Sequence, residues 1–96
     1  MGSFEIVYRP SAVKDIAAIP LKRQQRIKDT IECKLTTNPT LYGVPLHGNL
    51  KAFYKLRVGD YRVVFTVSNH IVRIFCIGLR KDIYKKTERR EGSADK

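Results

Sequence analysis

The sequence is poor in cysteine and in acidic residues, and it has no long run of apolar residues. Two cysteines, Cys33 and Cys76, are too few for the disulfide framework of a small secreted protein, so we expect both to be reduced and to lie in or near the core. No segment approaches the about 18 to 20 apolar residues that a membrane-spanning helix needs. The first ten residues lack the apolar region of a signal peptide, so the predicted location is the cytoplasm and no membrane partner is expected.

Metal ligands are also scarce. The two histidines, His47 and His70, have no Cys, His or carboxylate neighbour at metal-ligand spacing, so we expect neither a metal nor another cofactor. The charge that is present is one-sided, with 19 Lys and Arg against 9 Asp and Glu in 96 residues. A formal charge of +10 says little about the fold, but it favours partners that carry negative charge, such as nucleic acid or an acidic protein.

The order of the hydrophobic patterns predicts a single α+β domain. Apolar residues recur at helical spacing in two consecutive segments, through Val13, Ile16 and Ala17 and then through Ile27, Ile31 and Leu35. Alternating patterns follow in the second half of the chain. The predicted elements are a strand at 4–9, a helix that opens at Pro10-Ser11 with Ser11 as its N-cap, a helix from Pro20 to about Thr37, a loop at 38–50, strands at 52–58, 61–68 and 71–78, and a short helix at 80–86.

This order, β-α-α-β-β-β, predicts a two-layer arrangement. The last three strands form an antiparallel meander, the first strand joins an edge, and the helical hairpin covers one face of the sheet. Residues 1–86 make up the predicted domain. The polar residues 87–96 are expected to form a charged, flexible tail.

A tight turn between two of the strands brings basic residues face to face. Gly59-Asp60 has the chemistry of a two-residue type II′ hairpin, which places Arg57 directly opposite Arg62. Because side chains alternate along a strand, Lys55, Arg57 and Arg62 share the face that the helices do not cover. Solvation alone explains many basic residues on sheet surfaces, but it does not require like charges to lie opposite each other, an arrangement that is destabilising.

Two further residues reach the same end of the sheet. Arg80 follows the last strand and arrives near Arg62, and Tyr84 lies one helical turn later on the same side as Arg80. A cluster that repels itself needs a counter-charge, and phosphate suits guanidinium groups well. We therefore predict a site for a phosphate-containing polymer. Further candidates for binding RNA at its margin are Lys51, Lys81 and Lys85.

Nearly the whole chain, about residues 4–86, resembles the RelE/ParE superfamily of toxins from toxin–antitoxin systems. The resemblance runs from the helical hairpin through "PLHGNLKAFYKLRVGDYRVVFTV" and "IVRIFCIGLRKDIYKK", and it is sharpest in "YKLRVGDYRVVF" and "IGLRKDIY". It implies the two-layer fold of RelE-like microbial RNases and a cognate acidic antitoxin that wraps and neutralises the toxin. It also implies that the toxin–antitoxin complex binds operator DNA through the antitoxin.

The same resemblance leaves two activities open. RelE-like members cleave mRNA without metal, typically in the ribosomal A site, and so inhibit translation. ParE-like members poison DNA gyrase and lack the cleavage residues. The RelE pattern uses basic residues on one strand, an Arg at the start of the next, and an Arg and a Tyr after the last. The matching residues here, which form the predicted catalytic set, are Lys55, Arg57, Arg62, Arg80 and Tyr84.

The match has one departure. Many relatives read Gly-His-Arg where this sequence has Gly78-Leu79-Arg80, and a leucine cannot carry a proton. The general base is therefore Lys55 or Tyr84, since nearby positive charge disfavours an ammonium and favours a phenolate. Tyr84 is alternatively a stacking platform for a base. We expect an mRNA endonuclease; the alternatives are a gyrase inhibitor without nuclease activity and a member that only binds its partners.

Overall fold

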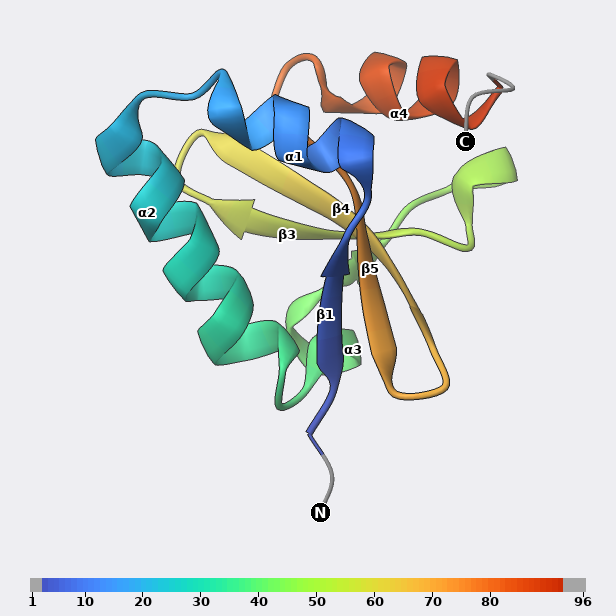
Figure 1. The fold of residues 1–96 in the computed structure, drawn as a ribbon. Coiled ribbons are helices and arrows are strands. Elements are labelled where there is room, and N and C mark those ends of the chain that lie inside the picture. Colours follow the sequence, from blue (N-terminus) through green and yellow to red (C-terminus); the bar gives the residue numbers. More distant parts are fainter. Residues whose placement is uncertain (1–2, 93–96) are drawn as a thin grey trace.

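The computed structural model describes residues 3–92 as a five-stranded sheet with helices on both faces (Figure 1). Within these residues, no helix has the length and apolar character to cross a membrane. The elements are β1 (Glu5–Tyr8), α1 (Pro10–Ala17), α2 (Leu21–Thr30), a π-helical turn (Ile31–Leu35), α3 (Pro39–Tyr42), β2 (Val44–Pro45), a 3-10 turn (Gly48–Leu50), β3 (Tyr54–Val58), β4 (Tyr61–Ser68), β5 (Ile71–Leu79) and α4 (Ile83–Glu91).

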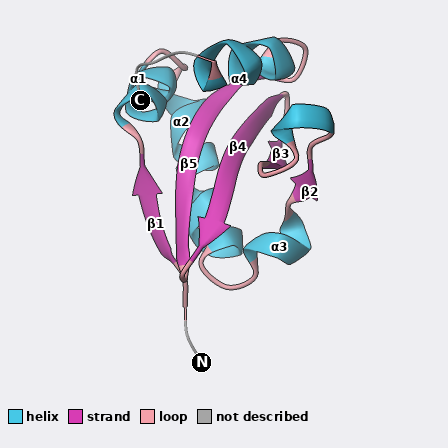
Figure 2. Ribbon diagram, turned by 90° about the vertical axis from the view of Figure 1, so that its right-hand side faces the viewer, coloured by secondary structure: helices cyan, strands magenta, loops and turns pink. Residues whose placement is uncertain are grey.

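The sheet confirms the predicted α+β topology and adds one strand. Its order is β1-β5-β4-β3-β2, with β1 parallel to β5 and the other neighbours antiparallel (Figure 2). The segment predicted as the loop 38–50 contains α3, the two-residue strand β2 and the 3-10 turn. Pro39 begins α3 because the first helical position does not need an N–H. The following strand begins at Tyr54 rather than at residue 52.

The first helix buries a different stripe from the one its sequence suggested. Ala12, Ile16 and Ile19 are buried, whereas Val13 is 50% exposed and Ala17 is exposed. Helix α1 begins at Pro10 with Arg9 as its N-cap, so the predicted N-cap Ser11 lies inside the first turn. The buried residues of α1 differ from those expected because only Arg9 separates the end of β1 from the start of the helix. The end of β1 therefore sets the direction in which α1 lies on the sheet.

Each face of the sheet has its own hydrophobic core. On the first face, α1 and α2 pack over strands β3, β4 and β5, with Ile27 and Ile31 against residues such as Val63 and Phe65. On the second face, a smaller cluster covers Val64 and Cys76. Its other members come from α4 and from the segment before β3 and are Ile83, Leu46, Leu50 and Phe53, together with Phe75. The second face, which we expected to be an open basic surface, is therefore covered over part of its area.

A β-bulge in β5 explains the second core. Val64 pairs with Cys76 while Phe65 pairs with Ile74, so Phe75 has no partner on β4. The extra residue interrupts the alternation of side chains. Ile74 and Ile77, three residues apart, consequently both join the first core, whereas Phe75 and Cys76 both join the second. The bulge thus supplies the apolar floor on which α4 packs.

The two cysteines are free thiols in different surroundings. Cys76 is fully buried, and burial raises the pKa of its thiol. Cys33 is exposed, which corrects the expectation that it lies in or near the core. Its neighbours Ile31 and Leu35 turn to the first core instead, and Cys33 lies between them on the outer side of the π-helical turn.

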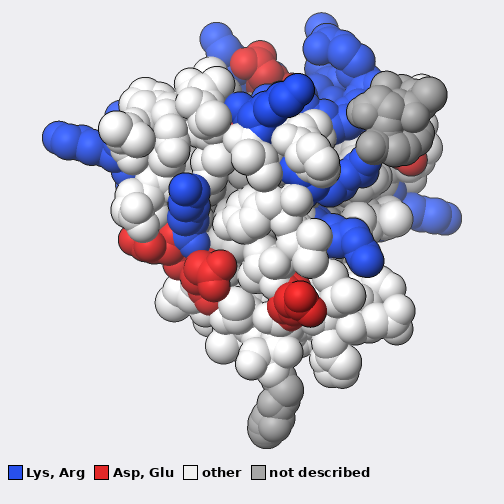
Figure 3. Space-filling model, in the orientation of Figure 1, with Lys and Arg blue, Asp and Glu red and all other residues white. Residues whose placement is uncertain are grey.

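Surface charge is divided unevenly over the molecule. In the view of Figure 3, Lys and Arg side chains gather over the upper and right-hand part, where α4 lies, and most of the visible Asp and Glu side chains lie in the lower half. Helix α4 contains four basic residues, which are Lys85, Lys86, Arg89 and Arg90, and Lys81 lies in the turn just before it. A helix with this charge needs a specific attachment to the rest of the chain.

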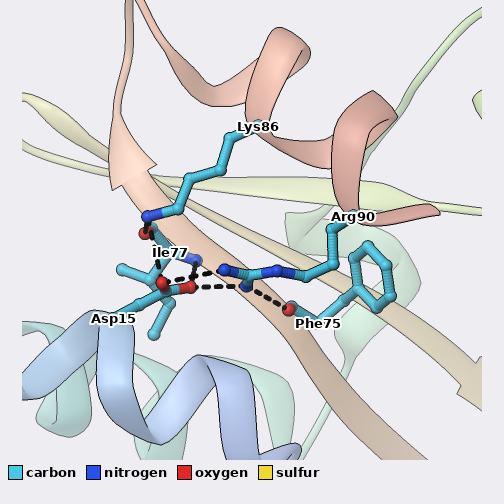
Figure 4. A network of polar contacts seen from close by, with 5 residues as sticks. All are labelled: Asp15, Phe75, Ile77, Lys86 and Arg90. Carbon is cyan, nitrogen blue, oxygen red and sulfur yellow. Dashed lines mark hydrogen bonds and ion pairs between the residues drawn. The ribbon is translucent and has the colours of Figure 1, made fainter. Parts of the chain in front are cut away.

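An ion network around Asp15 provides that attachment (Figure 4). The parallel strand β1 pairs with β5 only as far as Ile74, so the edge of β5 beyond it lacks a neighbouring strand. Asp15 accepts a hydrogen bond from the Ile77 N–H at 3.0 Å. Lys86 donates to the Ile77 carbonyl at 2.8 Å, and Arg90 donates to the Phe75 carbonyl at 3.1 Å. The network therefore satisfies the backbone groups that the short β1 leaves open.

The same three side chains neutralise one another. The Lys86 Nζ lies 3.0 Å from Asp15 Oδ1, and the Arg90 Nη1 lies 2.7 Å from Asp15 Oδ2. Burial acts to raise the pKa of the Asp15 carboxyl, but hydrogen bonds from Arg90, the Ile77 N–H and Lys86 outweigh it and hold the pKa below its usual 3.8. The charged form of Asp15 is therefore favoured in the folded protein.

Because of this attachment, α4 continues further than its sequence suggested. The tail predicted to be flexible from residue 87 is helical through Glu91, and Thr87 is fully buried. The ion pair of Arg90 with Asp15 joins residues 75 positions apart, so no local pattern reveals it. The last part of the predicted tail, residues 93–96, lies outside the described residues.

Replacing Asp15 tests the network. Asp15→Asn keeps the shape but removes the charge that both cations share, and we expect it to lower the free energy of unfolding at pH 7 by about 2 to 4 kcal/mol. Asp29→Asn is the control, because Asp29 is an exposed partner of Gln25 on α2. Denaturant unfolding measures both variants, and equal effects would contradict the network.

The effect should depend on pH in a defined direction. The pKa of the Asp15 carboxyl is lowered on folding, so its contribution is complete above the usual value of 3.8 and is lost as the pH falls through the lower folded value. The stability difference between the natural chain and Asp15→Asn should therefore shrink on acidification below about pH 4. A difference that stays constant from pH 7 to pH 2 would show that the charge is not responsible.

Gly43 offers an independent test of the first core. A Cβ on this residue would lie 2.6 Å from Cζ of the fully buried Phe65 and 3.1 Å from Cβ of Tyr54. Its φ of −90° suits any residue, so crowding alone sets the cost. We expect Gly43→Ala to lower the free energy of unfolding by about 1 to 3 kcal/mol. In Gly92→Ala, the new Cβ lies 3.5 Å from its nearest neighbour, and stability should stay within about 0.5 kcal/mol.

Candidate active site

The β3–β4 hairpin places two arginines opposite each other. Gly59 has a φ of +61°, and Asp60 does not share this left-handed conformation, as a type II′ turn requires. Arg57 pairs directly with Arg62, and Lys55 pairs with Val64 of the second core. Since side chains alternate, Lys55, Arg57 and Arg62 extend from the second face. The Arg62 Nη1 donates to the carbonyls of Gly59 and Tyr61, at 3.0 and 2.9 Å, which holds its side chain beside the turn.

The end of β5 brings a third arginine to this hairpin. Tyr61 pairs with Leu79, and the Arg80 N–H donates to the Asp60 carbonyl at 2.9 Å. Partial loss of hydration and the positive charges of Arg57 and Arg80 lower the pKa of Arg62. The three guanidinium groups therefore act on one another electrostatically. An anion bound among them would relieve their repulsion.

Tyr84 meets Lys55 at the edge of the arginines. The Lys55 Nζ donates a hydrogen bond to the Tyr84 Oη at 2.6 Å and lies 4.8 Å from the centre of the Tyr84 ring. The two residues come from β3 and α4 and are 29 positions apart in the sequence. The Tyr84 side chain is 42% exposed, so a ligand can reach the pair. We call Lys55, Arg57, Arg62, Arg80 and Tyr84 the basic cluster.

The side chains of the three lysines expected at the margin make no polar contact with the basic cluster among the described residues. Lys51 follows the 3-10 turn, Lys81 follows Arg80, and Lys85 is exposed on α4. None of the three side chains makes a hydrogen bond or an ion pair with another of residues 3–92. Lys81 lines a shallow hollow of about 310 Å³ together with Asp60, Leu79 and Arg80.

Within residues 3–92, neither histidine makes a side-chain hydrogen bond to the basic cluster. His70 occupies the β4–β5 turn, at the other end of the nine-residue strand β5, and is therefore about 25 to 30 Å from Leu79. His47 is exposed before the 3-10 turn, and Leu79 is 39% exposed at the rim of the hollow beside Arg80. Among the described residues, no group of three His, Cys, Asp or Glu side chains could hold a metal ion.

Sequence reasoning missed the residues that position Tyr84. Ile83 is anchored in the second core, and Lys86 and Arg90 are held by Asp15, so both sides of Tyr84 on α4 are fixed. One signal was available, because Asp15 lies three residues after Ala12 and four before Ile19, both buried. A charged residue on a buried stripe predicts a partner, although it does not identify the partner.

Known proteins are similar to this chain in sequence and in fold. Residues 6–84 match the family model described as the ParE toxin of type II toxin–antitoxin systems, parDE. The Toxin RelE of Mycobacterium tuberculosis (strain ATCC 25618 / H37Rv) is 29% identical over 84 residues, which cover 85% of this chain and 87% of that protein.

Two solved structures are similar over most of their length. The crystal structure of the toxin–antitoxin complex RelBE2 from Mycobacterium tuberculosis matches with a TM-score of 0.79 and 21% identity, covering 85% of this chain and 97% of that one. The RelB–RelE antitoxin–toxin complex from Methanococcus jannaschii matches with a TM-score of 0.64 and 26% identity, covering 83% and 96%. With its β-α-α-β-β-β fold and a family match over most of its length, the chain belongs to the RelE/ParE superfamily of toxins of type II toxin–antitoxin systems.

Proposed function

We propose that this toxin is an mRNA endonuclease of the RelE type, which inhibits translation by cutting messages in the ribosomal A site. The observation that carries the proposal is the 2.6 Å contact between Lys55 and Tyr84 beside three arginines. A pair of groups that can exchange a proton, next to concentrated positive charge, is what cleavage of a phosphodiester requires. The proposed reaction needs no metal or other cofactor.

The reaction uses the 2′-hydroxyl of the RNA itself. One member of the Lys55–Tyr84 pair takes the proton from this hydroxyl, and the 2′-oxygen attacks the adjacent phosphorus. The bond from phosphorus to the 5′-oxygen breaks, which leaves a 2′,3′-cyclic phosphate on one product, and the 5′-oxygen of the other takes up a proton. Because Lys55 and Tyr84 share a hydrogen bond, the proton taken by one can pass through the other to that oxygen.

The arginines stabilise the charge that develops during the attack. Arg57 and Arg62, on paired strands, face the phosphorane, whose oxygens carry more negative charge than the starting phosphodiester. Arg80 is placed by the Asp60 carbonyl and stabilises the leaving oxygen. The mutual repulsion of these three side chains in the free protein is relieved most when negative charge on the phosphate is greatest.

The expected partners follow from charge and from the relatives. Both solved relatives described above were crystallised as complexes of a toxin with an antitoxin. With a formal charge of +10, this toxin suits an acidic antitoxin segment that orders on binding. In this proposal the antitoxin neutralises the toxin, the complex binds operator DNA through the antitoxin, and the toxin acts in the cytoplasm.

Removing the side chains of Arg80 and Tyr84 tests the nuclease. We expect Arg80→Ala/Tyr84→Ala to reduce mRNA cleavage at least about 100-fold, because the change removes one phosphate contact and one partner of the proton-transfer pair. Controlled induction in bacteria followed by 5′-end mapping of a translated message measures the cuts. Lys22→Ala/Lys28→Ala on α2 removes two exposed basic residues elsewhere and should leave cleavage unchanged. Cleavage that survives in the Arg80/Tyr84 variant would show that the site is elsewhere.

Gyrase inhibition is the second candidate, and Leu79 favours it. The family model that matches is named for ParE, and Leu79 stands where many RelE-like members have a histidine. If the toxin inhibits gyrase, its induction should trap gyrase on DNA and leave mRNA intact. Induction that produces neither cut messages nor trapped gyrase, and that leaves growth unaffected, would indicate a member that only binds its partners.

A further inference from the structure

A second basic hollow lies on the second face, apart from the basic cluster. It has a volume of about 370 Å³, and its arginines come from the junction of β1 and α1, from β5 and from α4. The residues that line it are Arg9, Phe53, Thr66, Arg73, Phe75, Arg90 and one carboxylate, Glu91. We call it the arginine hollow. None of these residues belongs to the basic cluster, and the proposed cleavage reaction leaves them without a role.

The β-bulge builds the floor of the arginine hollow. Phe75, the extra residue of the bulge, packs against Phe53 with tilted rings whose centres lie 4.8 Å apart, and both residues are only 7% exposed. The Arg9 guanidinium lies over the Phe75 ring at 4.9 Å. This contact orients the planar guanidinium group before any ligand arrives, which lowers the entropy cost of binding.

The charge of the arginine hollow is only partly balanced. Arg90 is paired with Asp15, whereas Arg9 and Arg73 have no ion-pair partner within residues 3–92. Arg73 lies on the strand between Val7 and Thr66, at the same level of the sheet. Two guanidinium groups with open donors, above an aromatic floor and beside a hydroxyl, fit an anion of the size of a phosphate group.

The arginine hollow and the basic cluster lie on the same face at a spacing that suits one nucleic-acid strand. Thr66 and Arg62 are four residues apart on β4 and point to the same face, so they are about 13 Å from each other. A stacked strand has one phosphate per about 3.4 Å, so about four nucleotides cover this distance. Lys85 and Arg89 are exposed on α4, the helix that carries both Tyr84 and Arg90, and add positive charge to it.

We propose that the arginine hollow binds a backbone phosphate of single-stranded RNA, about four nucleotides from the bond that the basic cluster holds. The inference rests on the proposed function, because it extends the same RNA beyond the cleavage site. Arg9 and Arg73 hold the phosphate through their guanidinium groups, and the Thr66 hydroxyl donates to it. The common face and the matching spacing favour RNA over an acidic peptide, because a peptide has no regular phosphate repeat that would place a charge at both sites.

The test compares a short and a long RNA that cannot be cut. Fluorescence anisotropy measures binding of 2′-O-methyl oligonucleotides of three and of ten nucleotides at several salt concentrations. The variants are Arg73→Ala, which removes an exposed side chain, and Arg9→Ala/Arg73→Ala. The matched control is Lys22→Ala/Lys28→Ala, which removes the same charge from the exposed side of α2. Thermal unfolding shows whether each variant is folded.

The proposal predicts a loss that depends on RNA length. The double arginine variant should bind the ten-nucleotide RNA about tenfold more weakly, and its dependence of log affinity on log salt should be shallower by about 0.7, as expected for the loss of one neutralised phosphate of a single strand. Arg73→Ala should show about half of the change in slope. Binding of the three-nucleotide RNA, and binding of both RNAs to the control, should stay within about twofold of the natural chain.

Three results would overturn the proposal. They are equal losses for the arginine and lysine variants, an equal loss for short and long RNA, and a loss confined to binding of an acidic polyglutamate peptide. The outcome is separable from that of the proposed function. Cleavage without the length-dependent loss would leave the nuclease standing and reject the arginine hollow. A length-dependent loss in a toxin that cuts no mRNA would support RNA binding at the arginine hollow and reject the nuclease.

Discussion

The ion network of Asp15 with Lys86 and Arg90 is the contact on which the second face of this toxin depends. Strand β1 is too short to cover the whole edge of β5, and backbone groups at Phe75 and Ile77 would otherwise lack partners. One carboxylate and two cations satisfy them and fasten a strongly basic helix at the same time. Both the position of Tyr84 in the basic cluster and that of Arg90 in the arginine hollow follow from this attachment.

Positive charge elsewhere on the second face is concentrated rather than spread. Arg57 and Arg62 face each other across a strand pair, which costs stability unless an anion lies between or beside them. The apolar cores supply the stability that tolerates this cost, because the sheet is packed on both faces. In our proposal the repulsion is useful, since it is relieved by the phosphates of RNA and, when the toxin is neutralised, by the carboxylates of an antitoxin.

In our proposal the basic cluster favours one of the two activities that the superfamily offers. A gyrase inhibitor has no need for a lysine in contact with a tyrosine beside three arginines, and this arrangement favours the nuclease. Leu79 favours the gyrase inhibitor instead, because it stands where many RelE-like members have a histidine that carries a proton. In the proposed reaction, the hydrogen-bonded Lys55 and Tyr84 take over the transfer of the proton.

The sequence by itself determined the order of the elements and the pairing of Arg57 with Arg62, because strand alternation and a two-residue turn are local properties. It also brought Arg80 to the same hairpin, since neighbouring antiparallel strands meet at their ends. The bulge at Phe75, the stripe of α1 and the partners of Asp15 were decided only in the tertiary structure. Each depends on packing between segments up to 75 residues apart, where the free energy of burial and ion pairing outweighs any local preference of the chain.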